Sequence, residues 1–509
     1  MRACIAVERD VRARRSFLLP ILLLYLLHIA GVPIFILALI AIWYTAILRL
    51  ESMGSLDRMD ATRVLGIILM LRTRRGKGIL DAISSHKRFW RCFGEFSIWL
   101  CLVVMAGVIL LLFASAYSTA QSPPEDYLPA SDLLLIPGVT SFVPFWWPAL
   151  ALIVALVIHE YSHGIQARAH GMRLRSFGLL LVGPIPIGAF AEPEEEEMNR
   201  APRRDRMRLF AAGPSINILA TYVVLILLSA VSSGMVAENE GVHARGIVQG
   251  GAAEGAGLLP YEIITHMNGV EVPDGDAFSI QMEEFAAGDQ VAITVLSDPS
   301  LDGVREERTI ELTLGDRYQF HIGLCEEDQV CEDETGELLE ELGIEPGDGF
   351  LGVSQLSSGT AGVDGFSFIV EGEYSFGVTA FVALIEPLIM LQTPISLDGQ
   401  TMILEERAML EAGSGFLGAA IGTEGTLMLF DFLFWLVWIN FLLGFANLIP
   451  MIPFDGGHLV RDGVHSALTW LKTGMHPMKI EQLANRISSM SSFFILFILA
   501  IPVIIPRIF

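Results

Sequence analysis

The sequence LVIHEYSHG (residues 156–164) places two histidines and a glutamate at the end of an apolar run, PFWWPALALIVALVIH (144–159). The run is long enough to predict a membrane-spanning helix over 143–166, because a bilayer core needs about 20 apolar residues. Lipid disfavours polar side chains, so His159, Glu160 and His163 require an internal cavity or a ligand. The stretch therefore predicts both a membrane fold and a site within it.

Apolar runs of spanning length recur along the chain. Of its 509 residues 52% are hydrophobic, and the mean hydropathy is +0.54, which excludes an ordinary soluble protein. Further spans are expected at 96–118, 209–232, 426–449 and 491–507. The first apolar block, 17–50, is interrupted by AGVP at 30–33 and fits either one long tilted helix or a two-helix hairpin. The predicted fold is an α-helical polytopic membrane protein with about six or seven transmembrane helices.

Basic residues orient these spans, because cytoplasmic loops hold an excess of Lys and Arg. The loop 51–95 carries nine of them and 119–142 carries none, while 167–208 and 461–490 are basic again. We therefore expect a plasma-membrane protein whose histidine site lies towards the cytoplasm. The chain changes side at each span, and the basic N-terminus is also expected in the cytoplasm. The number of crossings therefore favours a two-helix hairpin at the start of the chain, and it makes 234–425 extracytoplasmic.

The insertion 234–425 is acidic and rich in glycine. Over 241–315, short runs that alternate apolar and polar residues are broken by glycines, as in DQVAITVLSD and RTIELTLG. This pattern predicts β-strands, with a short helix near 251–257. Residues 316–425 are unassigned, and within them FGVTAFVALIEPLIML (376–391) fits either an interfacial helix or a re-entrant segment.

The chain is strongly acidic, with a formal net charge of −24 and only four lysines among 33 basic residues. Adaptation to high salt and GC-rich codon usage both fit this composition. No basic patch resembles a nucleic-acid surface, so nucleic acid is not expected as a partner. The five cysteines form no C-x-x-C pair. Cys325 and Cys331 share one acidic segment, where a disulfide and free thiols both fit.

The spacing of the two histidines predicts a metal site. Residues four apart stack on one helix face, so His159 and His163 can both bind one Zn²⁺. Glu160, beside the first ligand, is placed to take a proton from a water molecule that the metal polarises. The alternative is a pair of histidines that ends a helix near the lipid headgroups, which the depth of His159 in the span disfavours.

A catalytic zinc needs a third protein ligand, and NLIPMIPFDGGH (447–458) provides the best candidate, Asp455. Pro450 and Pro453 predict irregular backbone around that carboxylate, and the two glycines after it permit a close approach. His458 is a competing ligand. Asn217 in AAGPSINI (211–218) is a further polar residue within an apolar span. It lies at the same depth towards the cytoplasm as the histidine and aspartate motifs, which supports one shared site.

The motifs HEYSH, GPSIN and NLIPMIPFDGG, in this order and each on a span, resemble the site-2 protease family of intramembrane zinc metalloproteases (peptidase M50-like). The resemblance covers 143–235 and 426–460, and GAAEGAGLLPYEIITHMNGVEV within 241–315 resembles part of a PDZ domain. Together with the composition it points to an archaeal halophile type. The resemblance implies that His159, His163 and Asp455 bind zinc and that Glu160 is the catalytic base. It also implies that Asn217 and Asn447 position substrate or stabilise the oxyanion.

The resemblance implies an enzyme that cleaves transmembrane segments of other membrane proteins (regulated intramembrane proteolysis). Residues 176–193 resemble the family's membrane-associated β-hairpin, whose strand edge would hold an unwound substrate by β-addition; a plain cytoplasmic loop is the alternative. The implied organisation is an N-terminal transmembrane region (1–142), a protease core (143–235 and 426–509), a PDZ-like domain (241–315) and an unassigned insertion (316–425).

Two other functions are considered. One is a different membrane HExxH peptidase with a glutamate as third ligand, for which no glutamate lies at the right depth. The other is a PDZ-bearing membrane scaffold or chaperone with a vestigial metal site, which the intact HExxH and DGG motifs disfavour.

Overall fold

The computed structural model describes residues 34–64, 67–73, 77–124, 132, 135–183, 185–298, 304–325, 329–372, 374–471 and 474–508. These residues form two compact units. Unit 1 takes the described residues of Met1–Leu225, Leu384–Gly399 and Phe432–Phe509, and unit 2 takes those of Ile226–Ala383 and Gln400–Asp431.

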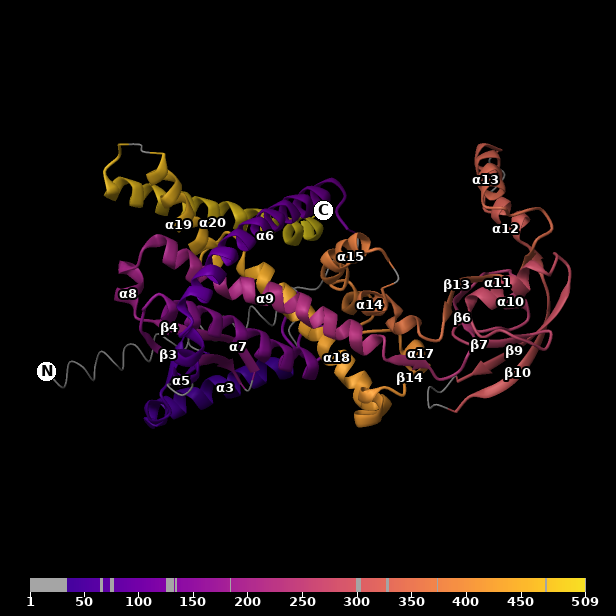
Figure 1. Ribbon diagram of the computed structural model, residues 1–509, viewed down its shortest axis with the longest axis horizontal. Helices are drawn as coiled ribbons and strands as arrows, with labels where there is room; N and C mark the ends of the chain where they lie inside the picture. The colour runs from indigo at the N-terminus through magenta and orange to yellow at the C-terminus, as the bar shows by residue number, and fades with distance from the viewer. Residues whose placement is uncertain are drawn as a thin grey trace. The chain divides into compact units, whose positions relative to one another are not determined.

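Within the described ranges, five helices are long and apolar enough to cross a membrane, and each of them covers all or most of one of the five single spans predicted from the sequence. They are α6 (Lys87–Gln121), α7 (Trp146–Ala169), α9 (Arg203–Ser232), α18 (Phe416–Asn447) and α20 (Pro477–Ile508) (Figure 1). Residues 17–33 of the first apolar block, 17–50, lie outside the described residues, and the remainder belongs to α3 (Ile34–Ser52), so the choice between one long helix and a hairpin stays a prediction.

The outer helices leave apolar side chains exposed. Trp99 and Leu110 on α6 and Phe493 on α20 are each more than half exposed. Because a contiguous apolar surface of this kind is unstable in water, the exposed face is suited to contact lipid. In contrast α7, α9 and α18 are at least half buried, so these three helices form the centre of the helical structure.

One prediction near the C-terminus is wrong. The segment 461–490 is not a loop, because α19 (Asp455–Trp470) fills its first part and α20 already begins at Pro477. The irregular backbone predicted from Pro450 and Pro453 is present over residues 448–454, and Asp455 directly after it is the first residue of α19. Both prolines of the motif precede the helix, and an aspartate in a first turn is favoured by the helix dipole. The polar residues of α19 hid a helix that a hydropathy profile does not detect.

A four-stranded sheet accompanies the helices of unit 1. The predicted hairpin is confirmed as β3 (Leu174–Val182) and β4 (Ile185–Pro193), paired antiparallel. It is extended by β1 (Ala61–Val64) and β2 (Ile68–Thr73) in the order β1-β2-β3-β4. The segment 51–95 is therefore not a plain loop, since it also contains α4 (Ser55–Arg58) and α5 (Lys77–Ser84). Strand β2 covers the far edge of β3, and β4 is left as an edge strand that packs against α7.

Unit 2 contains a β-sheet in the order β10-β9-β7-β6-β13, with β8 beside β7 (Figure 1). The strands predicted in 241–315 are confirmed as β6 (Val242–Ile247), β7 (Ile263–Met267), β8 (Val270–Glu271), β9 (Gln290–Ser297) and β10 (Glu306–Thr313). The predicted short helix is α10 (Ala252–Gly255). The sheet does not end at 315, however, because β13 (Val353–Ser358) pairs with β6. Val242, Ile264 and Val295 are completely buried in its core, with α11 (Gly275–Glu283) packed alongside through Phe278.

Unit 2 has further elements, all but β5 in the insertion after β10. They are β11 (Gly315–Asp316), α12 (Arg317–Gly323), α13 (Gln329–Glu341), β12 (Gly349–Phe350), α14 (Ala361–Glu371), α17 (Leu404–Arg407) and the pair β5 (Met235–Ala237) and β14 (Leu410–Ala412). A disulfide joins Cys325 to Cys331, which decides between the two states that the sequence left open. The apolar stretch 376–391 forms α15 (Phe376–Ile389), followed by α16 (Thr393–Ser396).

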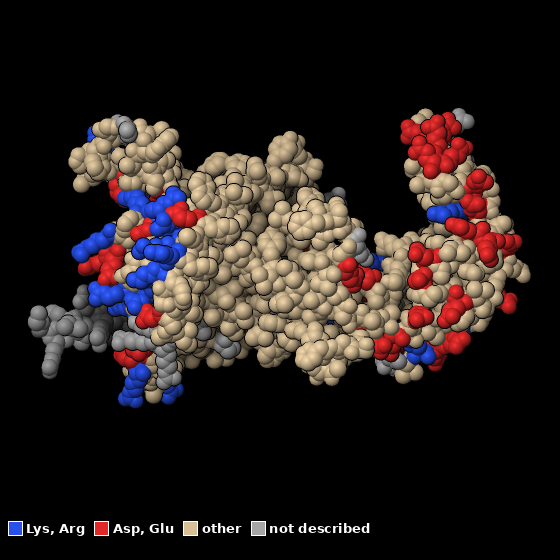
Figure 2. All heavy atoms as spheres, viewed as in Figure 1, with Lys and Arg blue, Asp and Glu red and all other residues tan. Residues whose placement is uncertain are grey.

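Charge is distributed differently on the two units. On the face drawn in Figure 2, Lys and Arg gather at one end of unit 1, around α8 (Glu195–Arg200) and the start of α9, whereas Asp and Glu are spread over unit 2. Several of these arginines form ion pairs within unit 1, among them Arg204 with Glu95. The basic end of unit 1 agrees with the Arg-rich segment 167–208 that oriented the spans.

A buried ion cluster joins α17 to the sheet of unit 2. Glu406 is 1% exposed and accepts hydrogen bonds from His243 Nε2 at 3.1 Å and Arg245 Nε at 2.6 Å. Burial raises the pKa of Glu406. The hydrogen bonds from His243 and Arg245 and the charge of Arg245 together lower it by more than burial raises it, so the pKa of Glu406 lies below its usual value. Tyr261 lies close to Glu406, and Asp364 close to Arg245, completing the charged surroundings.

We expect Glu406→Gln to destabilise unit 2 by about 3 kcal/mol, because it leaves the buried partners of a carboxylate uncompensated. The pKa of Glu406 is lower in the folded protein than in the unfolded chain, where it is about 4.5. Glu406 therefore stabilises the fold above about pH 4.5, and this contribution is lost as the pH falls through its folded-state pKa. The difference between variant and wild type should therefore shrink below about pH 4.5. Thermal unfolding of the full chain, with hydrogen exchange followed over Val242–Ile247, measures this. Glu405→Gln on the same helix is the control, and an equal effect of both substitutions would contradict the prediction.

Candidate metal centre

Helix α7 brings the two histidines together. His159 and His163 are 4% and 7% exposed, and their Nε2 atoms lie 3.1 Å apart. The carboxylate of Glu160 belongs to the same cluster, in which one ligand atom from each of the three residues lies within 4.8 Å of the others. The structure thus assembles the three residues that the sequence motif selected.

Hydrogen bonds to the other ring nitrogens determine which imidazole nitrogen carries the proton. His163 Nδ1 lies 2.7 Å from the backbone oxygen of Leu209, which can only accept, so Nδ1 carries hydrogen. His159 Nδ1 lies 2.6 Å from Asn217 Oδ1. The amide nitrogen of Asn217 is identified by its bond to the Ala155 oxygen, so Oδ1 is the acceptor and His159 Nδ1 the donor. Both Nε2 atoms therefore direct lone pairs at the site.

Asp455, at the start of α19, supplies a third acceptor to the same point. Its Oδ2 atom lies 3.2 Å from the Nε2 atoms of both His159 and His163. Three acceptors at such spacing repel one another unless a cation lies between them. Ligands about 2.0–2.2 Å from a tetrahedral Zn²⁺ lie roughly 3.3–3.6 Å apart, so the donor set and its spacing fit zinc.

Glycines give the ligands the room they need. A Cβ on Gly213 of α9 would lie 2.3 Å from His163 Nε2 and 2.6 Å from His159 Nε2. A Cβ on Gly456 would lie 2.7 Å from the Ile449 oxygen, and one on Gly457 2.5 Å from the Ile452 nitrogen. The close approach that the sequence analysis expected of the two glycines after Asp455 is therefore present. The contact of Gly213 with the imidazoles was not predicted, because the Gly-Pro pair could be explained as an ordinary helix start.

Other candidate residues lie in different surroundings. Asn217 is completely buried, and its amide nitrogen also donates to Asn440 Oδ1 at 2.9 Å. Asn447 donates to the Leu443 oxygen of its own helix. His458 stacks on Phe210 with ring centroids 4.6 Å apart, and it is not in the cluster of metal-binding groups found among the described residues. Asn440 was missed, although a buried amide within an apolar span was a visible signal.

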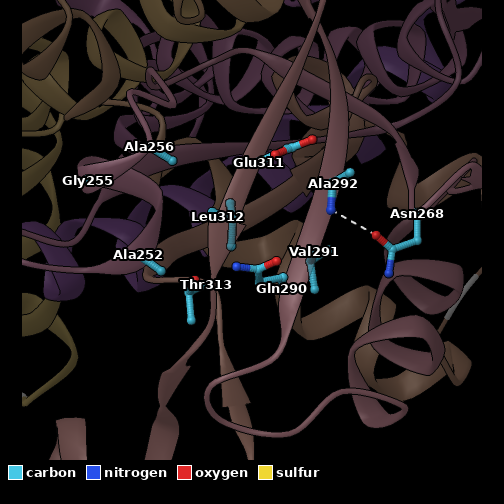
Figure 3. Close-up of a pocket in the computed structure, with 10 residues that line it drawn as sticks. All are labelled: Ala252, Gly255, Ala256, Asn268, Gln290, Val291, Ala292, Glu311, Leu312 and Thr313. Carbon is cyan, nitrogen blue, oxygen red and sulfur yellow. Dashed lines mark hydrogen bonds between the residues drawn. The ribbon is translucent and has the colours of Figure 1, made fainter.

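A cavity of about 660 Å³ lies in unit 2, and none of these residues lines it. Figure 3 shows the small side chains of Ala252 in α10 and of Ala256 directly after it on one side, and residues of β9 and β10 on the other. Its polar groups include Gln290, Glu311 and Asn268, whose Oδ1 accepts from the Ala292 amide. Glu311 is the single carboxylate that lines this cavity, and the described lining residues offer no set of metal ligands.

Comparison with known proteins agrees with this geometry. Residues 147–497, more than half of the chain, match the sequence profile of peptidase family M50. An uncharacterized protein of Methanocaldococcus jannaschii is 28% identical over 171 residues, covering 32% of this chain and 44% of that protein. A putative zinc metalloprotease of Xylella fastidiosa is 24% identical, covering 42% of this chain and 54% of that protein.

A third relative extends the match. Zinc metalloprotease Rip1 of Mycobacterium tuberculosis is 25% identical over 379 residues, covering 65% of this chain and 88% of that protein. For the first two relatives, the chain spans only about half of their length. The range matched by the family, 147–497, contains His159, Glu160, His163 and Asp455.

Proposed function

Since this chain belongs to peptidase family M50, we propose that it is a zinc metalloendopeptidase of the site-2 protease type. Its proposed substrates are membrane proteins, cleaved in or near their transmembrane segments. Zn²⁺ is the cofactor, as the zinc metalloproteases among its relatives and the His159–Glu160–His163 cluster indicate. The observation that carries the proposal is the convergence of two imidazole lone pairs and the Asp455 carboxylate on one point beside Glu160.

In the proposed mechanism, His159, His163 and Asp455 hold the ion, which when bound supplies Lewis-acid polarisation of the peptide carbonyl and of a water molecule. Glu160 accepts the proton that the attacking water loses, and then delivers it to the leaving amine. The half-buried position of Glu160 beside both imidazoles supports this role. Asn217 orients the ring of His159 through the 2.6 Å hydrogen bond to Nδ1.

Substrate handling is proposed from the sheet of unit 1. A helical substrate protects its carbonyl groups by hydrogen bonds, so it must unwind before cleavage. Edge strand β4 offers backbone groups for β-addition next to α7, and β2 already occupies the other side of the hairpin. Asn217 and Asn447 are the proposed residues for substrate positioning or oxyanion stabilisation. The amide of Asn217 is already engaged by Ala155 and Asn440, which favours Asn447 for a direct contact.

The proposed orientation puts the metal centre towards the cytoplasm of a multi-pass membrane protein. The basic end of unit 1 supports it (Figure 2). Unit 2 would then be an extracytoplasmic PDZ-like domain, supported by its sheet, the short helix α10 and the cavity beside it. A scaffold with a vestigial metal site is the second candidate, and a peptide that binds without being cleaved would favour it.

The proposal predicts cleavage that depends on the metal. Purified full chain in lipid should cut a labelled transmembrane peptide with a central Gly-Pro pair, and a chelator should reduce the rate by at least about 100-fold, because it removes the Lewis acid. Added Zn²⁺ should restore the rate. An all-leucine helix of equal length is the matched control and should be cut poorly. Chelator-insensitive cleavage, or none by zinc-loaded protein, would rule the function out.

A further inference from the structure

Asp462 is a buried carboxylate that the mechanism does not use. It lies on α19 and is completely buried, while the side chain of Arg206 on α9 is 9% exposed. Arg206 Nε donates to Asp462 Oδ2 at 2.9 Å, and its Nη2 donates to Oδ1, which gives a two-pronged contact. Arg203, also on α9, donates from Nη1 to Asp462 Oδ1 at 3.0 Å and pairs with Glu481 of α20. A carboxylate removed from water to this extent is tolerated only with such partners.

The position of this ion cluster relates it to the metal centre. Asp462 follows Asp455 by seven residues on α19, and Gly213 follows Arg206 by seven residues on α9. Seven residues make about two helical turns, so each pair lies on one face of its helix roughly 10 Å apart. The two helices therefore approach each other at two points: directly at Arg206 with Asp462, and through the two imidazoles of α7, which both Gly213 of α9 and Asp455 of α19 border.

Apolar packing alone would not fix the position of α9 along α19. Between the two meeting points, Met207 and Ala211 of α9 share a core cluster with Leu459 of α19. Small and flexible side chains of this kind allow helices to slide at modest cost. At the metal-site end of this contact, Gly213 of α9 and Gly456 of α19 also have no side chains that would interlock. A two-pronged guanidinium–carboxylate contact, in contrast, is directional and tolerates little displacement.

We infer that the Arg206–Asp462 pair, assisted by Arg203, is a register lock that holds Asp455 at the zinc site. Asp462 and the two arginines are positioning residues, since they act through Asp455 and do not touch the reacting atoms. The inference rests on the proposed function in that it takes Asp455 as a zinc ligand. It adds residues outside the HExxH, GPSIN and DGG motifs to the machinery of the site.

The test measures zinc affinity by competition with a chelating indicator on the full chain in lipid. Asp462→Asn keeps the size of the side chain and removes its charge. We expect the zinc affinity to fall about 10–100-fold, as for residues that orient metal ligands. The kcat should fall while KM for the peptide is unchanged, because α19 holds the ligand and not the substrate. Arg206→Lys keeps the charge without the two-pronged geometry and should show a smaller loss of the same kind.

The matched control is Arg204→Gln. Arg204 also lies on α9 and makes a two-pronged contact with one carboxylate, but its partner is Glu95 on α6. Zinc affinity of this variant should stay within about twofold of wild type, because the α9–α19 contact is intact. Thermal unfolding identifies variants that do not fold. If Asp462→Asn does not fold, the zinc affinity of Arg206→Lys decides the test instead.

Wild-type zinc affinity in a folded Asp462→Asn or Arg206→Lys variant would overturn the inference. An equal loss in Arg204→Gln would overturn it too, because the effect would then follow from any lost charge on α9. A wild-type protein that binds zinc but cleaves no peptide would refute the proposed function only, since zinc affinity still tests the lock. A wild-type protein that binds no zinc would refute both.

Discussion

Glu160→Gln should reduce peptide cleavage by about 10²–10⁴-fold while zinc stays bound. Glutamine matches the shape of glutamate but cannot accept the proton of the attacking water or return it to the leaving amine. The zinc ligands proposed here are His159, His163 and Asp455, so the donor set that converges on the site is unchanged. The measurements are the cleavage rate of the labelled transmembrane peptide and the zinc content of the same preparation.

Two further variants sharpen this result. Glu160→Asp keeps the carboxylate but shortens its reach, so it should retain part of the activity. Glu196→Gln removes an exposed carboxylate that pairs with Arg200 and should cleave as wild type does. Undiminished cleavage by Glu160→Gln would exclude Glu160 as the proton carrier, and loss of zinc in that variant would mean that Glu160 is a ligand instead.

Gly213→Ala should strongly weaken zinc binding and reduce the activity with it. The added Cβ would lie 2.3 Å from His163 Nε2 and 2.6 Å from His159 Nε2, in the space where both lone pairs point. These imidazoles cannot move aside easily, because their Nδ1 atoms are held by Leu209 and Asn217. We expect zinc affinity to fall by at least about 100-fold, comparable with the loss of a supporting residue at a metal site.

The helix itself should not suffer from this substitution. Alanine is about 1 kcal/mol more favourable than glycine within a helix, so α9 is stabilised while the site is obstructed. Gly107→Ala in α6 is the matched control, since a Cβ there meets no atom within 4 Å. Zinc titration and thermal unfolding of both variants provide the comparison. A zinc-loaded, active Gly213→Ala protein would show that the close approach of α9 to the two imidazoles is not needed.

The parts of the fold that the sequence predicted are those with a strong local signal. The five spans follow from hydropathy, and the hairpin β3–β4 and the strands of unit 2 follow from short alternating runs. Strand β1 and helix α19 were missed because their residues are mixed or polar, and β2, although its sequence ILMLRT is mainly apolar, is short and is paired with β3, which lies about a hundred residues later in the chain. Strand β13 was missed for the same reason, since its partner β6 lies about a hundred residues earlier.

The sequence by itself determined the chemistry of this protein. Two histidines one helical turn apart with a glutamate between them, and an aspartate before two glycines, select a metal and a proton carrier because side-chain type and spacing are local properties. Only the tertiary structure decided which atoms meet. Asn217 and Leu209 set the imidazole tautomers, Gly213 provides the space, and Arg206 with Asp462 joins α9 to α19. Such contacts depend on the packing of helices distant in sequence, and no local pattern records the rotation and register at which two helices pack.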